Sequence, residues 1–226
     1  MGLVELIAQA DARGLAASGL ACLDRCLPLL DGDDELVRPL WGSLADDSDW
    51  GGSLARARDT LGSAESAESV ESRESAGSAD GEAALLTRRM LETAPDARTA
   101  DALRPWADAC SDASLRVHRL LDPAVDGGPG PDGGPGSDGD PGSDGGPAVD
   151  GGPAPDGGPD AGRAGGVAAL PPLVAAELRR QTAVLELLAE HGAQGLRRAL
   201  DISVEGRRVL RAVVSRRARG TVGPGV

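Results

Sequence analysis

A stretch of 45 residues, 122–166, limits what this chain can fold into. It contains 26 Gly or Pro residues and six copies of a hexapeptide that begins Asp-Gly-Gly-Pro, one of them altered at Asp140. Glycine loses the most backbone entropy on ordering, and proline lacks a backbone donor. No large apolar residue recurs to offset these losses. The sequence therefore predicts a disordered linker between the two ends of the chain.

Glycine also recurs at every third position from Gly127 to Gly145, which is the spacing of a collagen triple helix. Only glycine fits at the axis of that helix, and the frame is interrupted at Ala148 and Ala154. We therefore interpret the repeat as a flexible linker rather than as a collagen-like trimer.

A second repeat places serine at every third position from Ser63 to Ser78, with glutamate between the serines. A period of three does not match the 3.6 residues of a helical turn, and large apolar residues are missing. We predict an acidic Ser/Glu-rich linker over residues 62–81.

The remaining segments have the spacing of amphipathic helices, with leucine three and four residues apart as between residues 20 and 30. Strand signals are almost absent, because the chain has two Ile and no Phe or Tyr. We predict an all-α fold of small helical bundle segments separated by the two disordered linkers. Segment 82–121 is expected to pack with 1–61, and 167–219 to form a basic helical hairpin before a disordered tail at 220–226.

Particular residues are expected to set the helix boundaries. Gly14 is a candidate C-cap of the first helix, and Pro28 is expected to end or kink the next one. Pro95 is expected to stop a helix that restarts at Thr99 or Asp101.

Charge is divided along the chain. The net charge is −13, and residues 1–61 carry 11 acidic residues and 5 arginines. Residues 167–226 reverse the sign, with 5 acidic residues and 10 arginines. This split predicts either an intramolecular contact between the acidic and basic parts or an anionic partner for the basic part.

Arginine pairs give the C-terminal segment its charge. Every basic side chain other than histidine is arginine, a composition typical of high-GC bacteria, so arginine by itself is weak evidence for phosphate recognition. We expect a protein partner, and the alternative is a helix–turn–helix that binds nucleic acid. The simplest interpretation is a solvated arginine-rich surface. The candidate partner-binding residues are Arg197, Arg198, Arg207, Arg208, Arg211, Arg216 and Arg217.

Cys22 and Cys26 share a helix face, and with Cys110 and His118 they suggest a zinc site. Structural zinc sites take ligands in two close pairs, whereas Cys110 and His118 are too far apart in sequence to form one. We expect buried core thiols instead. The acidic clusters near Asp31 fail the calcium-loop spacing.

Catalytic motifs are missing as well. The chain has two His and none of the common nucleophile, phosphate-loop or dinucleotide motifs. We therefore expect a non-enzymatic interaction or adaptor protein with no cofactor, no metal and no small-molecule substrate. Glu5 and Asp11 interrupt any apolar signal region, and no apolar run is long enough to span a membrane. The expected location is the cytoplasm.

Overall fold

The computed structural model describes residues 2–32, 34–68, 78–122 and 170–221. Regular secondary structure within these ranges is helical, which confirms the predicted all-α fold. The predictions for 123–166 and 222–226 fall outside the described residues. The helices are α1 (Leu3–Gln9), α2 (Ala12–Cys26), η1 (Leu27–Leu30), α3 (Arg38–Asp46), α4 (Trp50–Glu68), α6 (Ala79–Glu92), α7 (Ala100–Leu120), α9 (Pro172–His191), η2 (Gly192–Gly195) and α10 (Leu196–Thr221).

Most of the expected helix boundaries are confirmed. α2 ends at Cys26, and Pro28 lies in the short helix η1 that follows. Thr99 caps α7, because its hydroxyl accepts the Ala102 N–H at 3.4 Å. The prediction for Gly14 was wrong. This glycine lies in the first turn of α2, where the Asp11 carboxylate accepts its N–H at 2.7 Å.

The acidic Ser/Glu segment is helical at both of its ends. α4 continues to Glu68, past the boundary predicted at residue 61, and α6 begins at Ala79 with Ser78 as its cap. Alanine and glutamate favour helix, and extending a helix that already exists requires no new nucleation. The Ser/Glu sequence therefore prolongs its neighbouring helices. Residues 69–77 lie outside the described ranges.

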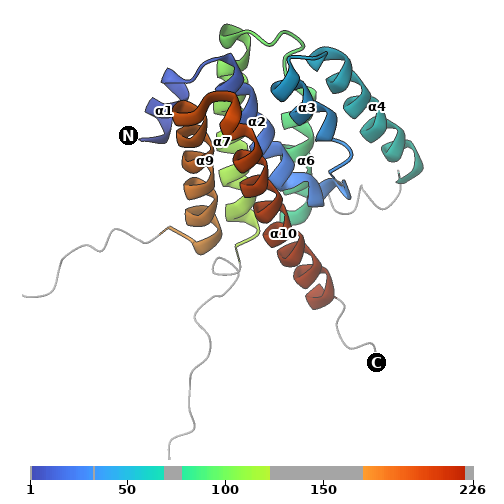
Figure 1. Cartoon of the computed structure of the whole chain (residues 1–226). Coiled ribbons are helices and arrows are strands. Elements are labelled where there is room, and N and C mark those ends of the chain that lie inside the picture. Colours follow the sequence, from blue (N-terminus) through green and yellow to red (C-terminus); the bar gives the residue numbers. More distant parts are fainter. Residues whose placement is uncertain (1, 33, 69–77, 123–169, 222–226) are drawn as a thin grey trace, which may run out of the picture. The chain divides into compact units, whose positions relative to one another are not determined.

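Helix α2 lies at the centre of the helical unit, in contact with α7, α10, α9, α3 and α6 (Figure 1). Every residue from Gly14 to Cys26 is buried. A helix that is covered on all sides needs side chains that let its neighbours approach closely, and this run contains mainly Ala, Gly, Ser, Cys and Leu.

Gly19 shows how close that approach is. A Cβ atom at this position would lie 2.4 Å from the Trp106 ring of α7, so only glycine leaves room for the indole. Trp106 also meets Trp50 of α4 edge to face, with ring centroids 6.2 Å apart. Two of the three tryptophans thus join α2, α4 and α7 in the core.

All three predicted helical segments contribute to one core. Its buried residues come from both sides of the Asp-Gly-Gly-Pro repeat and include Leu20, Leu91, Leu103, Val184 and Leu210. The described residues before position 123 and after position 169 belong to a single compact unit. The hairpin of α9 and α10 is therefore part of the same folded unit as α2 and α7.

Asp122, predicted as the first residue of the linker, is instead a buried part of this unit. Its Oδ2 accepts the Leu173 backbone N–H at 2.7 Å, at the start of α9. Because the first N–H groups of a helix have no partner within it, this carboxylate caps α9 from the end of α7.

Candidate functional site

The seven arginines predicted to bind a partner all lie on α10, and two of them form ion pairs with other helices of the unit. Arg207 is buried, and its Nη1 lies 2.6 Å from Asp24 Oδ1 of α2. Arg217 Nε donates to Asp80 Oδ1 of α6 at 3.0 Å. These two side chains join α10 to acidic residues of the N-terminal half.

The other five predicted arginines are exposed. Arg211 Nη2 donates to the Gly32 carbonyl at 3.4 Å. Arg208 lies 3.8 Å from Glu205 in a solvent-exposed pair, which contributes little to stability. The remaining three have no ion pair within the described ranges: Arg197, Arg198 and Arg216.

Most of the exposed arginines share the outer side of α10. Arg197, Arg208 and Arg219 are spaced by about three helical turns and so follow one line along the helix. Asp201 and Glu205 are interleaved with them on the same side. We call the following residues the arginine face: Arg197, Arg198, Arg208, Arg211, Arg216 and Arg219.

A shallow hollow of about 530 Å³ between α9 and α10 adjoins this face. Its charged lining is Arg179, Arg180, Asp201 and Glu205, and its apolar lining includes Ile202. Arg180 is half-buried, and burial lowers the pKa of its guanidinium. The surface therefore combines charges of both signs with apolar contact area.

A fully buried ion pair joins α2 to α9. Arg25 Nε and Nη2 donate to the two oxygens of Glu177 at 2.8 and 2.6 Å, and both side chains have no exposed surface. Ser114 Oγ of α7 donates to Glu177 at 2.7 Å, and Gln181 Nε2 donates at 2.9 Å. A buried carboxylate needs such donors, because burial otherwise disfavours its charge.

The pKa values follow from this geometry. Burial acts to raise the pKa of Glu177, but the Arg25 guanidinium and the donated hydrogen bonds outweigh it and lower the pKa to about 2. Burial acts to lower the pKa of Arg25, and Glu177 outweighs it and raises the pKa. Both groups are therefore charged at neutral pH.

The thiols and the histidine considered for chemistry lie in the same core. Burial raises the pKa of Cys22 to about 12 and also raises the pKa of Cys26 and Cys110. His118 Nδ1 lies 2.8 Å from the Ser114 carbonyl, so this nitrogen carries the proton. Burial lowers the pKa of His118 and outweighs the Glu177 carboxylate, which acts to raise it. These side chains are neutral and shielded from solvent at neutral pH.

The Arg25–Glu177 pair was not predicted from the sequence. A signal for half of it is present, because Glu177 and Gln181 fall on the apolar stripe of α9 with Val174, Val184 and Leu188. Polar residues on a buried stripe require partners. Nothing local in the sequence indicates that the partner of Glu177 is Arg25, 152 residues away.

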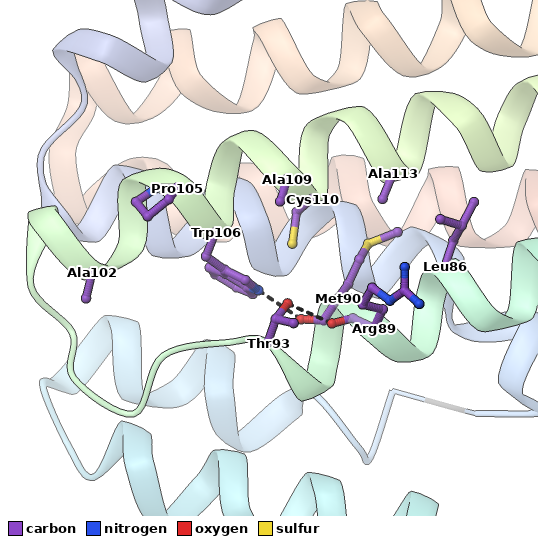
Figure 2. Close-up of a pocket in the computed structure, with 10 residues that line it drawn as sticks. All are labelled: Leu86, Arg89, Met90, Thr93, Ala102, Pro105, Trp106, Ala109, Cys110 and Ala113. Carbon is purple, nitrogen blue, oxygen red and sulfur yellow. Dashed lines mark hydrogen bonds between the residues drawn. The ribbon is translucent and has the colours of Figure 1, made fainter.

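A second surface feature is a pocket of about 330 Å³ between α6 and α7. Figure 2 shows Trp106 and Cys110 pointing from α7 toward α6, and Met90 reaching back from α6. Trp106 Nε1 donates to the Met90 carbonyl at 2.8 Å. Among the described residues that line the pocket, Arg89 is the one that carries a charge.

Comparisons with known proteins give no match, either to a family model, to a curated protein or to a solved structure. Within the described ranges, no helix is long and apolar enough to cross a membrane. The same residues contain no group of three or more His, Cys, Asp and Glu side chains arranged to hold a metal ion.

Proposed function

We propose that this chain is a non-enzymatic cytoplasmic interaction module that binds an acidic partner protein on the arginine face of α10. The observation that carries this proposal is the exposure of Arg197, Arg198 and Arg216 without acidic partners in the described part of a chain of net charge −13. A charged surface opposite in sign to the rest of a protein selects partners of complementary potential.

The charges around these arginines favour a protein partner over a nucleic acid. Asp201 and Glu205 lie on the same side of α10, where they would repel closely spaced phosphates. A protein surface can place a basic residue opposite each of them. The apolar part of the α9–α10 hollow, with Ile202, adds contact area that a protein side chain can cover.

The burial of the reactive side chains supports a role without catalysis. Cys22, Cys26 and Cys110 are buried and protonated, and His118 is enclosed beside them. A nucleophile or a general base has to reach its substrate.

The test is affinity capture with the full chain from a lysate of the native cells, carried out with and without nuclease treatment. The face variant is Arg197→Gln with Arg198→Gln and Arg216→Gln. The control changes the same number of exposed arginines on α4 and α7: Arg56→Gln, Arg116→Gln and Arg119→Gln.

We expect a specific protein to bind the wild type and the control but not the face variant. The complex rebuilt from purified components should weaken between about 0.15 and 0.5 M salt, because exposed charges are screened. Identical capture by all three chains would contradict the proposal. Binding that nuclease treatment abolishes would replace the protein partner with a nucleic acid.

A further inference from the structure

The α6–α7 pocket has the size and lining of a small-molecule site. Its volume, about 330 Å³, lies at the lower end of the range for ligand pockets. The walls are mostly apolar, with Trp106, Met90 and Cys110 toward the interior and Ala109 and Ala113 along α7 (Figure 2). Such a lining favours an apolar ligand body over a polar one.

The side-chain nitrogen and oxygen donors of the pocket walls already form hydrogen bonds, except for those of Arg89. Trp106 Nε1 donates to the Met90 carbonyl at 2.8 Å, and Thr93 Oγ1 donates to the Arg89 carbonyl at 2.7 Å. The Arg89 guanidinium has no hydrogen bond or ion pair within the described ranges, and none of the described residues that line the pocket is acidic. The pocket therefore presents one positive charge beside an apolar surface.

We propose that this pocket binds a small monocarboxylate with an aliphatic or aromatic body. The apolar body lies against Trp106 and Met90, and the carboxylate pairs with Arg89. A guanidinium matches the two oxygens of a carboxylate in a bidentate hydrogen-bonded pair. A dianion or a polyol would leave polar groups against the apolar wall without partners.

Figure 2 shows that the Arg89 side chain extends from α6 toward α7, beside Met90. Its guanidinium thus lies on the pocket side of α6, where it can pair with a carboxylate while the rest of the ligand enters between the helices. This proposal concerns a surface separate from the arginine face and does not depend on the proposed partner protein.

The experiment is calorimetric titration of the full chain with sodium octanoate. A parallel titration uses 1-octanol, which has an apolar chain of similar size but no charge. Two variants test the two halves of the site. Arg89→Gln removes the charge, and Ala109→Phe fills the pocket from α7. Arg119→Gln, an exposed arginine of α7 that does not line the pocket, is the charge control.

We expect saturable octanoate binding that changes Trp fluorescence, because Trp106 lines the pocket. Arg89→Gln should weaken octanoate binding by roughly three- to thirtyfold, the range expected for a partly exposed charged hydrogen bond. The same variant should change octanol binding by less than about twofold. Ala109→Phe should weaken both ligands, while Arg119→Gln should leave both unchanged.

The absence of saturable octanoate binding up to millimolar concentration would overturn the proposal. So would octanoate binding that is insensitive to Ala109→Phe in a variant whose circular dichroism and melting temperature match the wild type, since the ligand would then lie elsewhere. Equal loss of octanoate affinity in Arg89→Gln and Arg119→Gln would reduce the role of Arg89 to a general charge effect and contradict the assigned contact.

Discussion

At the scale of single residues, the folded state depends on charges enclosed in its core. Arg25 and Glu177 have no exposed surface, and Asp24 is buried beside Arg207. Each such charge loses its hydration, and only its partner and the surrounding donors compensate. Substitution of one partner is therefore more damaging than substitution of both.

Glu177→Leu should lower the free energy of unfolding by about 3–5 kcal/mol, because it leaves the Arg25 guanidinium buried without a counter-charge. Arg25→Met should have an effect of similar size for the converse reason. The double variant should lose clearly less than the sum of the two, as measured by urea denaturation. Additive losses would show that the two charges are not coupled.

His118 should make stability depend on pH in a mildly acidic range. Burial lowers its pKa below 6.5, so the unfolded chain binds this proton more readily than the folded chain. The contribution of neutral His118 to the free energy of unfolding is therefore fully present above about pH 6.5. It is lost as the pH drops, with a slope of at most about 1.4 kcal/mol per pH unit. Glu177, with a pKa lowered to about 2, loses its contribution at lower pH, between about 4.5 and 2.

Unfolding free energies between pH 5 and 7.5 provide the measurement. His118→Gln should flatten the profile. The matched control is His191→Gln, which removes the exposed ring at the end of α9. Burial raises the pKa of Asp24, so the contribution of Asp24 to stability changes with pH in the direction opposite to that of His118. The wild type and His118→Gln both contain Asp24, so its contribution cancels when their profiles are compared. An equally steep profile in His118→Gln would contradict the assignment.

At the scale of elements, α2 is packed from every side and has little room for change. Gly19 faces the Trp106 ring, and the Arg25 side chain passes Gly206 of α10, where a Cβ atom would lie 2.4 Å from Arg25 Cδ. The close packing of α2 against α7 and α10 thus depends on glycine at the contact points.

Gly19→Ala should destabilise the chain by about 1–3 kcal/mol, because the added methyl group overlaps the indole of Trp106. Gly42→Ala, in α3 with no atom within 4 Å of the new Cβ, is the matched control. It should stabilise the chain by about 0.5–1 kcal/mol, since alanine favours helix over glycine. Thermal unfolding of the two variants should therefore shift in opposite directions.

At the scale of the whole molecule, the core is shared between residues on either side of the Asp-Gly-Gly-Pro repeat. α2 contacts α9 and α10 as well as α7, and Asp122 caps α9. The residues before the repeat and the residues after it therefore both contribute side chains to the core, and neither side contains the whole core.

A chain with a protease site inserted within 123–169 tests this organisation. After cleavage, the two fragments should remain together in size-exclusion chromatography, because Val184, Leu185 and Leu210 are buried in the shared core. They should separate in urea. Separate elution under native conditions would contradict a shared core.

Much of this fold could be predicted from local sequence. Leucine spacing predicted the helices, and Pro28 and Thr99 predicted two of their boundaries. Gly14 was wrongly predicted as a C-cap, because Asp11 caps the start of α2 by accepting the Gly14 N–H and so places Gly14 in the first turn of that helix. The arginines of α10 could be identified as candidates, but only the packing of α10 distinguishes Arg207, buried against Asp24, from the exposed Arg197.

The sequence by itself determined that the fold is helical and that basic residues outnumber acidic ones only in the C-terminal segment, 167–226. These properties depend on residues a few positions apart or on composition alone. Only the tertiary structure decided that Arg25 meets Glu177 across 152 residues, and that Arg89 borders an apolar pocket. Such contacts depend on how helices distant in sequence pack together, and local periodicity carries no information about that pairing.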